Sequence, residues 1–149
     1  MCIKRTKEEQ QTADHLFNKL RDDLLSRDLS NTENYDRSIL VLSSSSLGLS
    51  LTAINFITPL SSASFIIILK SGWYLLVLSI ICSLIAYLVS NKAISVQLNN
   101  ARDYYQKGVE NAFSRKNKFS NLNSFLNLTT GVSFILAILL IVTFISINI

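Results

Sequence analysis

Residues 72–90 have the sequence GWYLLVLSIICSLIAYLVS, which contains no charged side chain. A run of about 18 or more uncharged, mostly apolar residues is long enough to cross the hydrocarbon layer of a bilayer as a helix. A surface helix of a soluble protein keeps a polar face toward water, and this stretch has no such face. It therefore predicts a transmembrane helix.

Two further stretches share this character. Residues 39–57 carry no charge, and residues 120–149 are uncharged to the end of the chain. We therefore expect an all-α membrane protein with three transmembrane helices. Their expected bounds, with flanking turns included, are 35–58, 72–113 and 124–149.

The second of these helices is expected to extend beyond the membrane into the cytoplasm. After residue 91, apolar side chains continue at helical spacing through Ile94, Leu98, Ala101 and Tyr105. Positions three and four apart lie on one face of a helix, so this pattern predicts one continuous helix from 72 to 113.

Residues 1–34 are expected to form a cytoplasmic amphipathic helix. Thr6 and Glu9 have the spacing of a capping box, in which each side chain caps the backbone of the other. An apolar stripe follows at spacings of four, three and four residues, formed by Ala13, Phe17, Leu20 and Leu24. The stripe predicts packing against another cytoplasmic helix.

The basic residues predict the orientation in the membrane. Seven precede the first uncharged stretch, 39–57, and six lie between the second, 72–90, and the third, 120–149, whereas Lys70 alone lies between the first two. Cytoplasmic segments are enriched in Lys and Arg. The amino terminus is therefore expected in the cytoplasm, residues 59–71 as an external loop, residues 114–123 as a basic cytoplasmic turn, and the carboxyl terminus outside. The short apolar run at 65–69 either extends the second span outward or lies in the membrane interface.

Polar residues in the first expected span are the first functional candidates. Ser44, Gly48, Thr52 and Asn55 recur at spacings of four, four and three residues and so share one helix face. Small and hydroxyl-bearing residues can serve helix packing, because they let backbones approach and form hydrogen bonds between helices. They can also line a water-filled pore built from several subunits. The sequence leaves both interpretations open.

A cytoplasmic basic set is the second candidate. It could simply hold the chain against anionic lipid headgroups, or it could bind a phosphate-rich ligand such as a nucleotide or oligonucleotide, with Tyr104 and Tyr105 available for stacking. The set consists of Arg102, Lys107, Arg115, Lys116 and Lys118.

The sequence offers no constellation for catalysis. His15 is the single histidine, and the two cysteines, Cys2 and Cys82, stand alone rather than in a metal-binding spacing. There is no glycine-rich phosphate loop. We therefore expect neither an enzyme nor a bound metal or cofactor.

The chain resembles the small membrane effectors encoded in bacterial phage-defence operons. The likeness is carried by DRSILVLSS at 36–44, by LGLSL at 47–51, and by Asn121-x-Asn123 ahead of a final helix that contains Gly131. It is most similar to the transmembrane effector of Hailong-type systems, with SLATT effectors as a broader neighbour.

The resemblance implies an oligomeric channel in the bacterial inner membrane, with a tetramer as one option, whose opening depolarises an infected cell. It also implies that a nucleotidyltransferase-like partner makes the controlling nucleic-acid ligand.

We therefore expect a homo-oligomeric channel in the lipid bilayer, gated through its cytoplasmic helices. The alternatives are a non-conducting membrane anchor or scaffold for a soluble partner, and a holin or antiholin.

Overall fold

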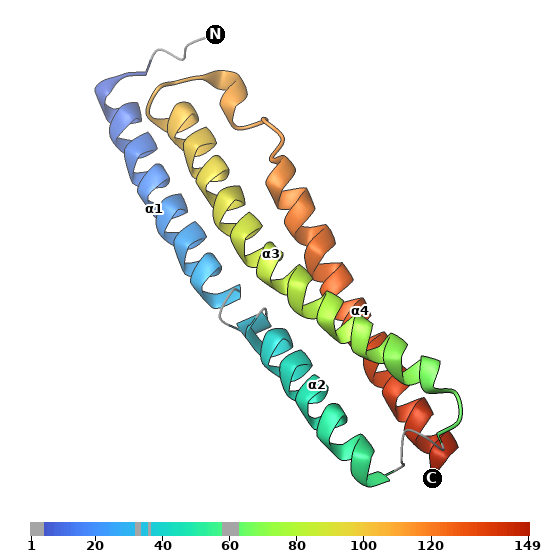
Figure 1. Ribbon diagram of the computed structural model, residues 1–149. Helices are drawn as coiled ribbons and strands as arrows, with labels where there is room; N and C mark the ends of the chain where they lie inside the picture. Colours follow the sequence, from blue (N-terminus) through green and yellow to red (C-terminus); the bar gives the residue numbers. More distant parts are fainter. Residues whose placement is uncertain (1–4, 32–33, 36, 58–62) are drawn as a thin grey trace. The chain divides into compact units, whose positions relative to one another are not determined.

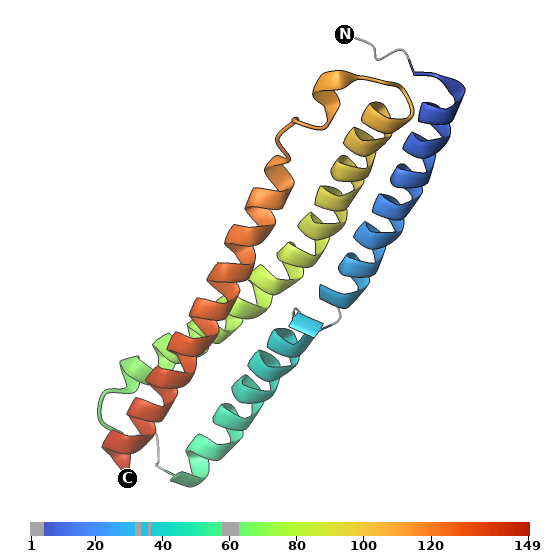
Figure 2. The same cartoon turned by 180° about the vertical axis from the view of Figure 1, so that it is seen from behind.

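The computed structural model describes residues 5–31, 34–35, 37–57 and 63–149. The described residues form helices and turns and contain no extended strand, as Figure 1 and, from behind, Figure 2 show. The elements are α1 (Lys7–Asn31), α2 (Arg37–Ile57), α3 (Ile66–Tyr105), the short 3-10 helix η2 (Glu110–Ala112) and α4 (Lys118–Asn148).

These elements divide into two compact units. Unit 1 comprises Met1–Thr32 and Tyr87–Asn123, and unit 2 comprises Glu33–Ala86 and Ser124–Ile149. The first half of α3 and most of α4 therefore belong to unit 2, together with α2. The second half of α3 belongs to unit 1, together with α1.

The apolar stripe of α1 packs inside unit 1. Ala13 and Phe17 are buried, and Leu20 and Leu24 are half-buried. The cytoplasmic stripe expected on α3 is also covered, with Ala101 buried within the same unit. The two stripes predicted from the spacing of apolar residues are thus confirmed as the interior of unit 1.

The predicted capping box begins α1. The backbone N–H of Thr6 donates to Glu9 Oε2 at 2.8 Å, and the backbone N–H of Glu9 donates to Thr6 Oγ1 at 3.3 Å. The hydrogen bond from the Thr6 backbone, more than any other contact, lowers the pKa of the Glu9 carboxyl. The box thus satisfies two backbone donors that would otherwise lack partners at a helix start.

The expected continuous helix from 72 to 113 ends earlier than predicted, and it begins earlier, by the outward extension that the sequence left open. α3 begins at Ile66, so the apolar run before Lys70 belongs to this helix and not to a loop. It ends at Tyr105, and Gly108 follows with a φ of 66°. Glycine adopts this left-handed conformation without steric penalty, so it turns the chain where the apolar pattern alone predicts continuation.

α4 also begins earlier than expected, because Asn117 caps it. Its Oδ1 accepts hydrogen bonds from the backbone N–H groups of Phe119 at 3.2 Å and Ser120 at 3.3 Å. Its Nδ2 donates to the carbonyl of Ala93 at 2.6 Å, which ties the start of α4 to α3 within unit 1. Residues 118–123, expected as part of a basic turn, are therefore helical.

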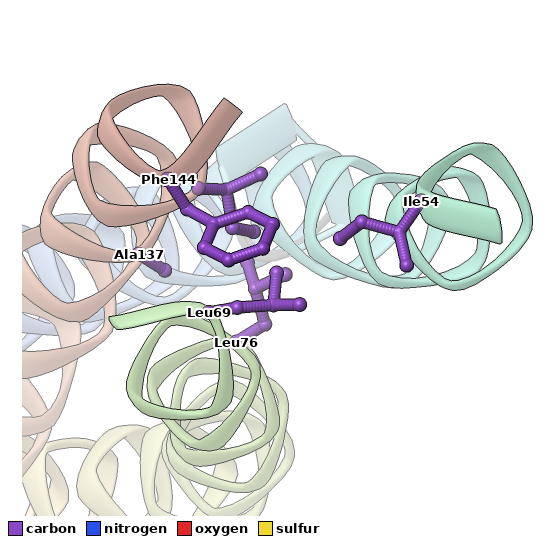
Figure 3. Close-up of a cluster of buried hydrophobic side chains, with 6 residues drawn as sticks. Ile54, Leu69, Leu76, Ala137 and Phe144 are labelled. Atoms are coloured by element: carbon purple, nitrogen blue, oxygen red, sulfur yellow. The ribbon is translucent and has the colours of Figure 1, made fainter. Parts of the chain in front are cut away.

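An apolar cluster holds unit 2 together. It joins α2, α3 and α4 through buried side chains, five of which Figure 3 labels, and it consists of Ile54, Leu69, Leu76, Ala137, Ile141 and Phe144. Gly72 allows the close approach of α3 and α4, because a Cβ there would lie 2.9 Å from Ile141 Cγ1 and 3.3 Å from the Ala137 carbonyl oxygen. Such contacts leave no room for a larger residue.

The expected architecture of three transmembrane helices is contradicted. Within the described ranges two helices, α3 and α4, are long and apolar enough to cross a membrane. α2 is a helix close to the expected bounds, 35–58, but its apolar residues are interrupted by hydroxyl side chains at 43–46, 50 and 52. Hydroxyl groups lower the hydrophobicity of a helix and so reduce its tendency to partition into hydrocarbon. Pro59, which directly follows the expected end of this helix at residue 58, lies outside the described residues.

Most of the apolar surface of α3 and α4 is uncovered. In their most apolar stretches only 33% of α3 and 28% of α4 is buried. The core helix of a soluble protein has most of its apolar surface buried, and exposed apolar surface on this scale marks contact with a membrane or a partner. The two helices therefore favour association with a membrane.

Candidate functional site

The end of α3 carries a cluster of aromatic rings and a guanidinium group in unit 1. Arg5 donates through Nη2 to the carbonyl of Tyr104 at 3.0 Å and through Nη1 to the carbonyl of Tyr105. Its guanidinium carbon lies 5.7 Å from the centre of the Tyr104 ring. The last carbonyls of a helix lack partners within it, so Arg5 both caps α3 and makes a cation–π contact.

The two tyrosines are packed rather than free. Their ring centres lie 5.0 Å apart in an edge-on arrangement, and the Tyr104 ring lies 5.4 Å from that of Phe113. Both tyrosines are half-buried, and Gln10 Nε2 donates to the Tyr105 carbonyl at 3.3 Å. A stacking ligand would therefore have to displace Arg5 from the face of Tyr104.

Two of the five predicted ligand-binding cations share one carboxylate. Lys107 Nζ lies 2.8 Å from Asp103 Oδ1, and Arg115 Nη1 lies 3.0 Å from Asp103 Oδ2. The hydrogen bond from Lys107 is the main cause that lowers the pKa of the Asp103 carboxyl, and the bond from Arg115 adds to it. One negative charge therefore offsets half of the charge that these two cations bring.

The other three predicted cations are exposed. Arg102 lies in the last turn of α3, Lys116 in the connecting segment and Lys118 at the start of α4. No ion pair involves any of the three within the described part of the chain. The structure thus keeps all five predicted residues in unit 1, but it does not gather them around one cavity.

Two hollows lie among the described residues of unit 1. The larger, about 470 Å³, is open and is lined by Arg5, both glutamates of the first turn of α1, and the two tyrosines. The smaller, about 220 Å³, is more enclosed and is lined partly by Gln97, Asn100, Phe113 and Arg115. Arg115 is the one member of the predicted set that lines either hollow. Arg5, Gln97 and Asn100 were not predicted, because their positions depend on where α1 and the turn after α3 fold back.

The predicted pore-lining residues lie on an exposed face of α2. Ser44, Gly48 and Thr52 are exposed, and a Cβ placed on Gly48 would meet nothing within 4 Å. Thr52 Oγ1 donates to the carbonyls of Gly48 and Leu49 at 3.1 and 3.0 Å. The side chain of Asn55 lies outside those described. The three described residues are therefore not packed within unit 2.

The opposite face of α2 carries the serines that do pack. Ser43 Oγ lies 3.3 Å from Ser79 Oγ on α3, and Trp73 Nε1 donates to Ser50 Oγ at 2.9 Å. Hydrogen bonds between helices are the usual role of serine in helical membrane bundles. Packing between helices therefore accounts for this face of α2, whereas the described part of the chain places no packing partner against Ser44, Gly48 and Thr52.

Sequence reasoning overlooked a layer of buried hydroxyl groups on the two apolar helices. Ser79 and Ser83 on α3 and Thr130 and Ser133 on α4 are all buried. Their spacings of four and three residues in otherwise apolar runs are the signal that could have revealed them, since they place each pair on one helix face.

Within the described ranges, no group of three His, Cys, Asp or Glu residues is placed to hold a metal ion. No family model, curated protein or solved structure matches the chain.

Proposed function

We propose that this protein is a homo-oligomeric membrane channel or pore-forming effector. The observation that carries the proposal is the exposed face of α2 formed by Ser44, Gly48 and Thr52. The opposite face of α2 packs against the two helices that are apolar enough to cross a membrane. A hydroxyl-bearing face directed away from such helices suits a water-filled path between copies of the chain, because polar groups beside a bilayer require water or protein partners.

Gly48 strengthens this argument. Glycine in a helix interior costs about 1 kcal/mol relative to alanine. Gly72 has a steric reason for its presence in unit 2, but nothing in the described structure approaches the position of a Gly48 Cβ. A water-filled path between copies, or the close approach of a helix from another copy, would explain why glycine stands at position 48. Nothing in the described part of a single chain explains it.

The gating ligand that we propose is a nucleotide or oligonucleotide bound by the basic residues of unit 1. Phosphate groups would compete with Asp103 for Lys107 and Arg115, and they would attract the exposed cations Arg102, Lys116 and Lys118. A ligand gates a channel only if it binds one conformation better than the other. The likeness to phage-defence effectors supports defence as the setting and a nucleotidyltransferase-like enzyme as the source of the ligand.

The proposed location is the bacterial inner membrane, with the segment between α3 and α4 in the cytoplasm and the carboxyl terminus outside. Six of the chain's 14 basic residues lie between residues 91 and 123, which favours the cytoplasmic side for this segment.

A non-conducting anchor or a holin-like protein is the competing function. An anchor needs apolar helices to hold the chain in the bilayer, but it has no use for an exposed face of small polar residues. That face is therefore the feature that favours a channel over an anchor.

Cysteine accessibility in a reconstituted system tests the channel. In a Cys2→Ser, Cys82→Ala background, Ser44→Cys and Thr52→Cys are introduced singly, and ion flux through the protein in liposomes is measured with a charged thiol reagent. Leu42→Cys is the control, because Leu42 is also exposed but lies two residues, or about 200° of helix, from Ser44.

Block of flux at positions 44 and 52, with position 42 unaffected, is the expected result. Equal block at all three positions, or a monomeric protein that conducts nothing with or without oligonucleotide, would contradict the channel and favour the anchor.

A further inference from the structure

Five buried hydroxyl-bearing residues form a polar layer inside unit 2, separate from its apolar cluster. We call them the hydroxyl layer: Ser43 of α2, Ser79 and Ser83 of α3, and Thr130 and Ser133 of α4. Each has at most a few per cent of its surface exposed. A polar group buried in such a place must find a hydrogen-bond partner or lose the one that water would supply.

Part of the layer is satisfied by a directed chain of hydrogen bonds. Ser79 Oγ donates to the carbonyl of Thr130 at 3.1 Å and lies 3.3 Å from Ser43 Oγ. A serine hydroxyl has a single hydrogen, and that of Ser79 is already used. Ser43 must therefore be the donor to Ser79, and the chain runs from α2 through α3 to the backbone of α4.

Thr130 Oγ1 is the exception. It is fully buried, and within the described residues it has no hydrogen-bond partner. Other hydroxyls of α4 are satisfied by their own helix, since Thr129, Thr143 and Ser146 donate to the carbonyl four residues earlier at 2.8 to 2.9 Å. Thr130 does not make this bond, so its hydroxyl is available to an occupant of the interior.

Asn127 Oδ1 provides a second open position one turn earlier on the same helix. This oxygen is buried and has no hydrogen-bond partner in the described part of the chain. Positions three residues apart share a helix face, so the amide oxygen and the Thr130 hydroxyl lie on the same side of α4. The occupant must donate a hydrogen bond to the amide oxygen and must also accept one from the hydroxyl.

We propose that an ordered internal water is bound at the edge of the hydroxyl layer, held by Thr130 Oγ1 and by the neighbouring Asn127 Oδ1. Water is the occupant that both donates and accepts, and buried waters typically make two to four hydrogen bonds to such groups. The polar oxygens of the layer are neutral, which disfavours a divalent cation, because Ca²⁺ and Mg²⁺ sites in proteins use carboxylates. The site needs neither a channel nor a ligand, so it stands independently of the proposed function.

Two variants at position 130 test the site in the full-length protein in detergent micelles or nanodiscs. Thr130→Val keeps the shape of the side chain and removes the hydroxyl, whereas Thr130→Ser keeps the hydroxyl and removes the methyl group. Thr143→Val is the matched control, because its hydroxyl is satisfied by the helix backbone and the residue is exposed. The readouts are the unfolding temperature and the magnetisation transfer between bound water and protein protons at positions 127 and 130.

The expected result is a long-lived water signal at Asn127 and Thr130 in the wild-type protein and in Thr130→Ser, and its loss in Thr130→Val. Thr130→Val should also lower the unfolding temperature more than Thr143→Val does. The proposal is overturned if the wild-type protein shows no such signal, or if Thr130→Val is as stable as the wild type. An unfolding temperature that rises with Na⁺ or K⁺ but not with choline, and only when the Thr130 hydroxyl is present, would replace water with a monovalent cation.

Discussion

At the scale of single residues, the capping box of α1 predicts a specific loss of stability. Thr6→Ala removes the hydroxyl that accepts from the Glu9 backbone, which should cost about 1 kcal/mol of helix stability. The pKa of Glu9 should rise toward its ordinary value, because the fixed first turn that aims the Thr6 N–H at its carboxylate is loosened. Thermal unfolding followed by circular dichroism, and titration of Glu9 by NMR, measure the two effects.

Thr12→Ala is the control for this prediction. The Thr12 hydroxyl donates to the Glu8 carbonyl inside the same helix, where the backbone bond remains after the hydroxyl is removed. Equal losses of stability in Thr6→Ala and Thr12→Ala would show that the cap is not the cause.

The two glycines of unit 2 predict opposite outcomes for the same substitution. Gly72→Ala should destabilise unit 2, because the new Cβ would meet Ile141 and the backbone of Ala137 at distances that force a shift. Gly48→Ala should leave the fold intact or stabilise it, since the space around Gly48 is open and alanine favours the helix. Protease resistance of the purified variants in detergent distinguishes the two. A destabilised Gly48→Ala would mean that another copy of the chain occupies that space.

At the scale of elements, the turn after α3 should loosen in acid. The lowered pKa of Asp103 means that its ionised form is stabilised by Lys107 and Arg115 in the folded state. This contribution is present above the pKa of the unfolded chain, about 4, and is lost as the pH falls through the lower pKa of the folded state. The protection factors of residues 103–115 in hydrogen exchange, which correct for the intrinsic effect of pH on amide exchange, should therefore fall in strong acid.

Asp103→Asn provides the test of that assignment. The variant should exchange rapidly at neutral pH and show no acid-dependent step from this group. It should also bind an oligonucleotide several-fold more tightly in fluorescence polarisation if the freed Lys107 and Arg115 contact phosphate. Weaker binding by Asp103→Asn would mean that Asp103 positions these cations rather than competing for them.

At the scale of the whole molecule, the exposed apolar faces of α3 and α4 predict tight membrane association. Leu84→Lys places a charge on the exposed face of α3, where insertion should cost about 3 kcal/mol, and the variant should leave the alkali-resistant membrane fraction. Asn99→Lys, in the half of the same helix that belongs to unit 1, should remain in that fraction. Retention of Leu84→Lys in that fraction would indicate that this face of α3 meets protein or water instead of lipid.

Local sequence patterns predicted much of the helical content. The Thr6–Glu9 box and the stripe of Ala13 and Phe17 were predicted correctly, because both depend on neighbours within one or two turns. The end of α3 was not, because the Gly108 turn interrupts a pattern that the apolar spacing continues. The start of α4 was misplaced for a similar reason, since Asn117 acts as cap only where the Ala93 carbonyl holds its amide.

For the candidate site, the sequence predicts which charged residues are present but not which of them pair with one another. The cations of the predicted set are obvious in the sequence, but the sharing of Asp103 by Lys107 and Arg115 depends on a turn that brings residues 12 positions apart together. Similarly, the sequence marks every serine of α2 as polar and cannot say which face packs.

The sequence by itself determined an all-helical chain with two strongly apolar helices, because hydrophobicity and period-3.6 patterning are properties of consecutive residues. The tertiary structure alone decided which hydroxyls of α2 face outward and which cations pair with Asp103. It also decided that the buried Thr130 hydroxyl has no hydrogen-bond partner among the described residues. The physical reason is that burial and hydrogen bonding depend on groups brought together from distant parts of the chain. Their partners are set by how helices pack, and no local pattern encodes that arrangement.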